Sequence, residues 1–488
     1  MSRIDRVAQA RERALAADSG GTLQRSLGAW ELILLGIGVI VGAGVFVATG
    51  VVAAENTGPA IVLSFVLASG TCFCAGLCYA EFAAMIPASG SAYSYVRAAF
   101  GPLAGWMIGW CLLLEYLMAA ATVAVGWSGY LSSLAQSFGV AMPVQWSAPT
   151  FGLAGGSLVT TGAVLNGPAV VLLMGITCLL TRGAQLSARA NAILVVVKLS
   201  IIGLFILCAA RYVHLANWRP FLPANTGQFG RYGWSGVLRG ASVMFYAYLG
   251  FDCVSTAARE TRDPQRNVPI GIIGSLLICT VIYIAFALVL TGIAPYTVLD
   301  VPNPVSVALA SVGNHLQFLK LAVDVGALLG LTSVVLVTLY GQSRILYAMS
   351  EDGLVPAILG RLGTRTKTPT VALLVGGVVA TITAGLFPIQ LLGQLISIGT
   401  LCAFTFVCAA VLYLRIARPE LQRPFRAPIA PAVCIIGVAA SAYLMAVLPG
   451  ITWREFLLWS LTGIAVYGIY GRCSRGRYRN IIDRPDGL

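Results

Sequence analysis

Charged side chains are scarce in this chain of 488 residues, since only 10% of them are Asp, Glu, Lys or Arg. A soluble domain carries roughly a quarter of its residues as these four types, so the composition excludes a water-soluble protein. Disorder is excluded as well, because disordered chains have few apolar residues and 58% of this chain is hydrophobic. The mean hydropathy of +0.86 indicates an integral membrane protein.

Residues that usually carry catalysis are also few. The chain has two histidines, His214 and His315, and both lie in predicted loops. No zinc-ligand spacing and no nucleotide-binding glycine loop is present in the sequence. The net charge of +13 would suit a nucleic-acid binder, but the bases lie between apolar runs rather than in one patch. We therefore expect no cofactor, no metal, no enzymatic activity and no nucleic-acid partner.

Twelve apolar stretches are long enough to cross a bilayer, because a spanning helix needs about 20 mostly apolar residues. Barrel strands would instead alternate over roughly ten residues. The first six stretches are Trp30–Ala53, Pro59–Ile86, Leu103–Leu131, Pro168–Leu180 (extending to about Ala184), Ala190–Ala210 and Gly233–Ala257. The other six are Pro269–Ile293, Phe318–Leu339, Thr370–Phe387, Leu391–Tyr413, Ala430–Leu448 and Phe456–Tyr470. The predicted fold class is an all-α polytopic membrane protein with twelve transmembrane helices in the lipid bilayer.

The basic residues predict the orientation of these spans. With a cytoplasmic N-terminus, 24 of the 31 lysines and arginines lie on the cytoplasmic side and five on the other side. Cytoplasmic loops carry the excess of such bases. We therefore expect a multi-pass protein of the cell (inner) membrane with both termini in the cytoplasm. The long external segment 132–167 has no charge and is predicted to be a surface loop.

Spans 1 and 6 differ from the others by their glycines. Span 1 contains GIGVIVGAGVFVATG and span 6 contains MFYAYLGFDCVSTAA. Such glycines mark either close helix packing or a helix that unwinds at mid-membrane, which is tolerated where the backbone lines a cavity. Interrupted helices at corresponding positions of two halves indicate a midplane binding site. Spans 1 and 6 would each open a five-helix half, which favours the binding site.

A break at Gly42–Ala43–Gly44 would present free N–H groups at a positive helix end, which suits a carboxylate. Unpaired carbonyls on the other side of the break, and in span 6, would accept from an ammonium group. Together they would recognise the head group of an α-amino acid. The predicted substrate-binding residues in the two breaks are Val39, Ile40, Ala43, Gly44, Tyr246, Ala247 and Leu249.

Four motifs occur in order along the chain: GAGVFVATG in span 1, FYAYLGFDCVSTAARETRDPQRNVPIGI across span 6, GLTSVVLVTLYGQSRILYAMSEDGL in span 8 and LISIGTLCAF in span 10. With these motifs the chain resembles the cationic-amino-acid-transporter branch of the amino acid–polyamine–organocation superfamily. The resemblance implies the leucine-transporter fold, in which two inverted five-helix repeats are followed by two peripheral helices. The implied division is a cytoplasmic segment 1–29, repeats 30–212 and 213–428, peripheral spans 11 and 12 in 429–472, and a cytoplasmic tail 473–488.

Lys198 lies in the middle of span 5, where ionisable groups are rare and functional by default. The structural alternative is a lysine that snorkels to the membrane interface. In proton-coupled bacterial members of the resembling family, a lysine at this place occupies the position of the sodium ion of sodium-coupled relatives. The resemblance therefore implies proton coupling through Lys198. Its expected partners are Thr332, Ser333 and the carbonyls near Gly38 and Val41.

Glu115 in the middle of span 3 has two interpretations that stay open. It is a buried, protonated hydrogen-bonding residue, or it faces the substrate side chain and attracts a cationic group. Glu31, Glu81 and Asp324 lie nearer span ends and are predicted to be anchors. Tyr246 is a candidate aromatic lid over the substrate.

The predicted function is secondary active transport of amino acids across the cytoplasmic membrane by alternating access, with proton-coupled uptake. Exchange of an amino acid for another or for a polyamine uses the same scaffold and remains the alternative. A membrane-embedded sensor or enzyme would need a soluble signalling domain or a catalytic constellation, and neither is visible in the sequence.

Overall fold

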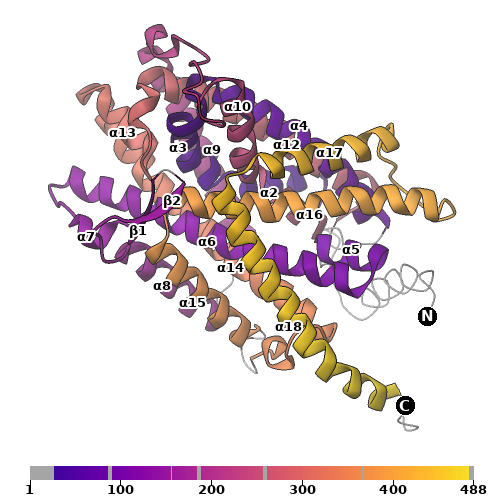
Figure 1. Ribbon diagram of the computed structural model, residues 1–488. Helices are drawn as coiled ribbons and strands as arrows, with labels where there is room; N and C mark the ends of the chain where they lie inside the picture. The colour runs from indigo at the N-terminus through magenta and orange to yellow at the C-terminus, as the bar shows by residue number, and fades with distance from the viewer. Residues whose placement is uncertain are drawn as a thin grey trace.

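The computed structural model describes residues 27–85, 91–154, 156–183, 188–256, 261–363, 366 and 368–482. Most of the predicted N-terminal segment and the end of the predicted tail therefore lie outside the described residues. Within the described ranges the chain is mostly helical, and each of the twelve predicted apolar stretches coincides with helical structure (Figure 1).

The first five stretches form a broken helix followed by four continuous ones. The broken one consists of α2 (Ala29–Ile40), η1 (Gly44–Ala48) and α3 (Thr49–Val52), and the short turns η2 (Ala53–Thr57) and η3 (Gly58–Ala60) follow. The continuous ones are α4 (Ile61–Met85), α6 (Pro102–Ser137), α8 (Gly167–Thr181) and α9 (Ala188–Ala209).

The sixth stretch is broken as well, into α10 (Gly233–Met244), η6 (Phe245–Tyr248) and α11 (Phe251–Thr256). The remaining stretches form α12 (Pro264–Ile293), α14 (Gln317–Glu351), α15 (Thr370–Leu386), α16 (Ile389–Ala417), α17 (Ala430–Val447) and α18 (Gly450–Ile482).

By length and composition, seven helical segments of the described chain could cross a membrane. They are Gly44–Met85, Pro102–Ser137, Ala192–Tyr212, Pro264–Ile293, Gln317–Glu351, Ile389–Ala417 and Ala430–Val447. Three shorter apolar helices are Ala29–Ile40, Gly167–Thr181 and Thr370–Leu386. The protein is therefore a polytopic membrane protein.

Local sequence explains several helix ends. Glu31 in the first turn of α2 accepts a hydrogen bond from the Gly28 N–H at 3.0 Å, and Asn166 Oδ1 accepts from the Ala169 N–H at the start of α8 at 3.3 Å. Both contacts satisfy N–H groups that a helix leaves free at its first turn. After α6 and α14, Gly139 and Gly353 adopt φ of +79° and +69°, the left-handed conformation that commonly ends helices.

The connections contain more structure than the sequence indicated. The predicted surface loop 132–167 includes α7 (Val144–Ser147) and a two-stranded antiparallel sheet of β1 (Phe151–Ala154) and β2 (Ser157–Thr160), so the fold is not purely α. Gly156 in the turn has φ of +79°, which glycine adopts without strain. Two short helices, α5 (Ser91–Phe100) and α13 (Pro304–Ser311), were also not predicted, and they lie at opposite ends of the bundle (Figure 1).

The centre of the bundle is α6, which packs along α14 and α16. Tryptophans fix α18 to its outer side. The Trp110 indole N–H donates to the Trp459 carbonyl at 2.8 Å, and the Trp459 indole N–H donates to the Trp110 carbonyl at 2.9 Å. The two indole rings also stack, with centroids 4.7 Å apart. These reciprocal bonds satisfy both indole donors away from water.

Asp324 connects three elements at the end of the bundle that carries α13. Its carboxylate lies on α14, is fully buried and accepts from Ser133 of α6 at 2.9 Å and from Ser306 of α13. Lys320, one turn earlier, lies 3.4 Å away. These contacts fit the anchoring role predicted for Asp324.

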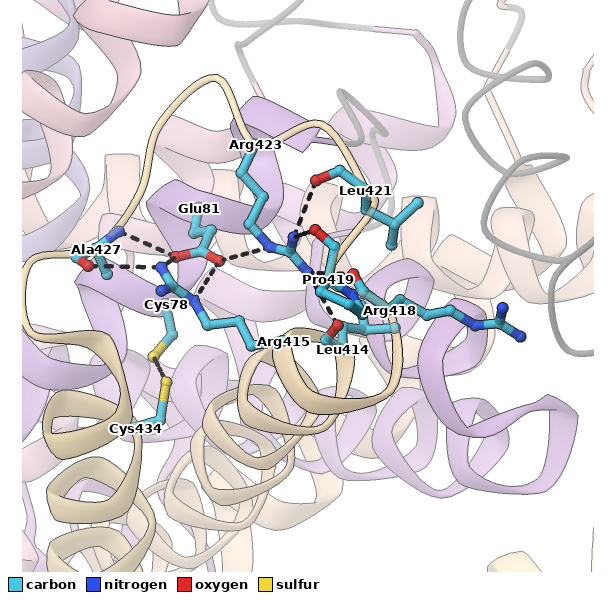
Figure 2. Close-up of polar contacts among 10 residues, drawn as sticks. All are labelled: Cys78, Glu81, Leu414, Arg415, Arg418, Pro419, Leu421, Arg423, Ala427 and Cys434. Carbon is cyan, nitrogen blue, oxygen red and sulfur yellow. Dashed lines mark hydrogen bonds and ion pairs between the residues drawn. The ribbon is translucent and has the colours of Figure 1, made fainter.

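Glu81 joins α4 to α16 and to the loop before α17 at the opposite, predicted cytoplasmic end (Figure 2). Its side chain is 1% exposed and accepts from Arg415 Nε at 2.9 Å and from the Ala427 N–H at 3.0 Å. Arg423 Nε approaches the same carboxylate to 3.5 Å. Two arginines and a backbone donor therefore compensate the burial of one carboxylate, as an anchor requires.

Replacing Glu81 by alanine is expected to lower the free energy of unfolding by about 3–5 kcal/mol, because the change leaves the guanidinium groups of Arg415 and Arg423 without their buried counter-charge. The measurement is thermal unfolding of the purified protein in detergent. Glu455→Ala is the matched control. Its pair with Arg454 is largely exposed, at 30% and 63%, so its loss is expected to cost about 1 kcal/mol or less. If both variants lower the unfolding temperature by the same amount, the anchoring role of Glu81 is contradicted.

Candidate functional site

The break in span 1 falls where the glycines predicted it. Helix α2 ends at Ile40, and Val41 turns to an extended conformation with φ −74° and ψ 101°. Among the described residues, the N–H groups of Gly42 and Ala43 have no backbone acceptor. Ala43 has already returned to helical angles, with φ −59° and ψ −27°. Two donors at the start of the outer helical segment are therefore available to a ligand.

The break in span 6 is a single unwound step between η6 and α11. Leu249 is extended, with φ −58° and ψ 136°, and Gly250 has φ of +113°. That angle is in the region which side chains other than glycine rarely adopt. Gly250 is therefore the residue that allows the helix to resume in a new direction at Phe251.

The two breaks touch each other. A Cβ atom placed on Gly250 would lie 2.4 Å from Cγ1 of Val39, and one placed on Gly44 would lie 2.5 Å from the Cα of Ala247. Both distances are shorter than a side chain tolerates, so glycine is required at both positions. Close packing and unwinding, which the sequence presented as alternatives, are thus both present in this structure.

Tyr283 of α12 connects the breaks by hydrogen bonding. Its hydroxyl lies 2.8 Å from the carbonyl oxygen of Ile40 and 3.0 Å from that of Ala247, and the side chain is fully buried. One hydroxyl proton is shared between two carbonyls that unwinding has freed. Tyr283 was not predicted as a site residue, because a tyrosine inside an apolar run is usually a packing residue.

A cavity of about 50 Å³ lies between the broken helices and their neighbours. Its lining unites most of the residues predicted to bind substrate, and also two of the predicted coupling residues. The predicted residues in the lining are Val39, Ile40, Ala43, Gly44, Tyr246, Leu249, Lys198 and Ser333.

The residues of the opposite wall were not predicted from the sequence. It is formed by apolar or hydroxyl-bearing residues of α6, α14 and α16: Ala119, Thr122, Val123, Val334, Val337, Thr338 and Ile396. Thr122 is fully buried, and its hydroxyl has no hydrogen-bond partner among the described residues. A buried hydroxyl without a partner is costly, so Thr122 offers a polar contact to a ligand.

Glu115, Ala247 and Thr332 do not line the cavity. Glu115 is buried on α6 beside Gly399 of α16, and its Oε2 has no hydrogen-bond partner in the described part of the chain. It precedes Ala119 by one helical turn, so it shares the face of α6 that lines the cavity but lies outside the lining. Ala247 supports the site through its backbone, as described above.

Lys198 of α9 reaches the end of α2. Its Nζ donates to the carbonyls of Gly38 at 3.2 Å and Val41 at 3.3 Å, and the residue is 2% exposed. The carbonyls at a helix C-terminus carry partial negative charge, which favours a cation there. In the described part of the chain, no carboxylate forms an ion pair with Lys198.

The two hydroxyls predicted as partners of Lys198 differ in position. Ser333 lines the cavity together with the lysine, whereas Thr332 does not. Both hydroxyls donate to carbonyls of their own helix at 2.7 Å. Ser333 donates to Gly330, and Thr332 donates to Leu328. Gly330 lies against the lysine stem, because a Cβ atom there would be 3.1 Å from Lys198 Cγ.

The chemistry of the cavity follows from these contacts. Backbone N–H groups suit an anionic oxygen, and the opposite wall is apolar apart from hydroxyl groups. Among the described residues, no carboxylate belongs to the lining. The cavity therefore suits a small molecule with one anionic group and an apolar remainder.

Comparison with known proteins gives one family. A family model described as amino acid permease matches residues 27–467. The methylthioribose transporter of Bacillus subtilis (strain 168) is 43% identical over 461 residues, which cover 94% of this chain and 96% of that relative. The branched-chain amino acid permease BcaP of the same strain is 42% identical over 460 residues, with 94% and 96% covered.

A plant relative is more distant. The cationic amino acid transporter 9, chloroplastic, of Arabidopsis thaliana is 35% identical over 407 residues, which cover 83% of this chain and 69% of that relative. The similar proteins thus carry names for three different substrate classes.

Tyr283→Phe is expected to loosen both breaks, because it leaves the buried carbonyls of Ile40 and Ala247 without a donor at a cost of about 1–3 kcal/mol. Amide hydrogen exchange, followed by mass spectrometry, should accelerate about tenfold or more in peptides that cover 37–49 and 244–250. Tyr347→Phe is the control, since that hydroxyl makes an exposed contact with Glu351. Unchanged exchange rates in both peptides would show that the hydrogen bonds of the Tyr283 hydroxyl do not stabilise the two breaks.

Proposed function

Because this chain belongs to the amino acid permease family, as the four sequence motifs predicted, we propose that it carries neutral α-amino acids with an aliphatic side chain across the cytoplasmic membrane. Transport is coupled to protons and proceeds by alternating access. The relatives are named permeases and transporters rather than enzymes.

The observation that supports an amino acid substrate is the pair of free donors in span 1. The N–H groups of Gly42 and Ala43 have no backbone acceptor in the described residues and lie at the positive end of the outer helical segment. A carboxylate satisfies both. The carbonyls freed in the same break accept from the ammonium group, each having a second lone pair beyond its present bond.

The apolar wall supports a neutral side chain. Val123, Val334 and Ile396 contribute aliphatic surface to the cavity, and a cationic substrate would lose its hydration there without a carboxylate to replace it. Glu115, which the sequence suggested for cationic substrates, lies outside the lining. The branched-chain permease among the relatives agrees with an aliphatic side chain. Methylthioribose, the substrate named for another relative, has no carboxylate or ammonium group for the two breaks.

The proposed architecture is the leucine-transporter fold with twelve spans. Spans 1–5 and 6–10 form inverted repeats, spans 11 and 12 are peripheral, and both termini are cytoplasmic. Support comes from the position of the breaks, because each proposed repeat opens with an interrupted helix and the two interruptions meet at the cavity. The distribution of lysine and arginine supports the orientation.

Lys198 is the proposed coupling residue. In its protonated form it donates to the carbonyls of Gly38 and Val41 and so holds the end of α2 against α9. Release of the proton toward the cytoplasm removes a charge that these carbonyls stabilise, and the inner half of span 1 is then free to move. Binding of substrate at the same break links this movement to transport. An exchanger of polyamines would instead need acidic groups in the lining.

Ala43→Pro tests the head-group site. Proline fixes φ near −65°, close to the −59° of Ala43, so the change removes a donor while keeping the local angle. Loss of a hydrogen bond to a charged group costs about 1.5–3 kcal/mol, which predicts roughly ten- to a hundredfold weaker isoleucine binding. The measurement is binding of radiolabelled isoleucine to the purified protein. Gly44→Val is less informative, since it would also clash with Ala247.

Ala43→Gly, which keeps the N–H group, is the matched control and should bind isoleucine nearly as the wild type does. Unchanged affinity in the proline variant would contradict the head-group site. Uptake by proteoliposomes of isoleucine, arginine and methylthioribose tests the substrate class. Preferential uptake of arginine would restore the role suggested for Glu115, and uptake of methylthioribose alone would reject an amino acid substrate.

Lys198→Arg tests the coupling, because arginine keeps its proton at every accessible pH. The variant is expected to retain isoleucine counterflow but to lose accumulation driven by an inward proton gradient in proteoliposomes. Lys198→Met, which has no ammonium group, should also fail to accumulate substrate.

Lys320→Arg is the conservative control away from the cavity, beside Asp324, and should accumulate isoleucine as the wild type does. If Lys198→Arg accumulates isoleucine with the wild-type rate and pH dependence, proton release from this lysine is not the coupling step. Loss of counterflow together with accumulation would indicate a purely structural role for Lys198.

A further inference from the structure

A second hollow lies away from the cavity, at the predicted cytoplasmic boundary of the membrane. It is a groove of about 540 Å³ between the first turns of α12 and the loop that joins α16 to α17. Helix α12 supplies Gln265, Arg266, Pro269, Ile270 and Ile273, and the loop supplies Phe425. Nothing in the transport site uses these residues.

The groove changes character along its length. Its lining follows one stripe of α12 from Gln265 to Gly274, a length of about 14 Å at 1.5 Å per residue. The polar end holds Gln265 and Arg266, and the other end is entirely apolar. Ile270 is 41% exposed, so the apolar end opens to the outside of the bundle, where lipid chains would lie.

The polar end carries positive charge that the described part of the chain does not neutralise. Arg266 is exposed and forms no ion pair with any described carboxylate, including that of Asp263 in the preceding turn. Arg426, which follows the lining residue Phe425 in the chain but is not itself in the lining, is also exposed and has no such ion pair among the described residues. This charge is complementary to an anionic headgroup.

The wall that carries Phe425 is fixed by the Glu81 network (Figure 2). Two residues after Phe425, the Ala427 N–H donates to Glu81 at 3.0 Å. Two residues before it, Arg423 donates to the carbonyls of Leu421 and Leu414 at 2.9 Å. The loop is therefore held on both sides of Phe425, so the groove is part of the folded structure.

We propose that this groove binds one anionic phospholipid of the cytoplasmic leaflet, with its phosphate at Arg266 and an acyl chain along Ile270, Ile273 and Phe425. Basic pockets between membrane helices on the cytoplasmic side suit such headgroups. A free phosphate would occupy only the polar end and would leave the apolar stripe uncovered. The apolar stripe therefore favours a lipid.

Native mass spectrometry of the purified protein, titrated in detergent with phosphatidylglycerol or phosphatidylcholine, tests the proposal. The wild type should bind one phosphatidylglycerol at least tenfold more tightly than phosphatidylcholine. Arg266→Gln should abolish that preference, because it removes the charge that faces the phosphate. Ile273→Trp, which fills the apolar end, should weaken binding of both lipids. Arg361→Gln is the matched control, an exposed arginine on the same predicted face but outside the groove, and should bind as the wild type does.

Several results would overturn the proposal. Equal binding of the two lipids by the wild type would leave only a non-specific apolar contact. An unchanged preference in Arg266→Gln, or equal losses in Arg266→Gln and Arg361→Gln, would place the lipid elsewhere. If inorganic phosphate displaces phosphatidylglycerol while Ile273→Trp binds normally, the site is for a free anion. A thermal unfolding scan of each variant verifies folding, and since Arg266 is exposed its change should not affect it.

Discussion

Two unwound segments meet in the middle of a membrane protein, and the need to satisfy their backbone groups governs the surrounding structure. Hydrocarbon offers no partners to free N–H and carbonyl groups, so such a backbone persists only where protein or a ligand supplies them. Tyr283 donates to the carbonyls of Ile40 and Ala247, and Lys198 donates to those of Gly38 and Val41. The donors of span 1 are left for a ligand.

This constraint brings the proposed substrate site and the proposed coupling residue to the same break. The carbonyl end of α2 takes the charge of Lys198, and the amide end of the outer segment opens into the cavity two residues later. In the proposed mechanism, a change at the lysine reaches the amide donors because Val41, which is extended, is only two residues from Ala43. The continuous helices α6, α14 and α16 supply the opposite wall, and α14 and α16 both pack against α6.

The polar contacts at the ends of the bundle have a different role. Asp324 ties α13 to α6 and α14, and Glu81 ties α4 to α16 and to the loop before α17. Both are buried carboxylates that their donors compensate, so they hold α13 and the loop before α17 against the bundle. The order that Glu81 gives to the loop around Phe425 is what makes a defined groove at the surface of the bundle.

The sequence by itself determined the membrane class, the twelve helical stretches, the two breaks and an intramembrane lysine at position 198, because apolar length, glycine and a lone intramembrane charge are local signals. The contact of Lys198 with span 1 was expected only from the family resemblance. Only the tertiary structure decided which residues share the cavity. Glu115 lies on the correct face of α6 but one turn away from the lining, and Thr122 and Tyr283 carry no distinguishing pattern in the sequence. The β1–β2 hairpin was missed because short strands in a glycine-rich loop have too little periodicity to detect. Which turn of a helix reaches the cavity, and which residues of neighbouring helices touch, depend on how the helices pack. Contacts between residues far apart in the chain leave no local pattern in a single sequence.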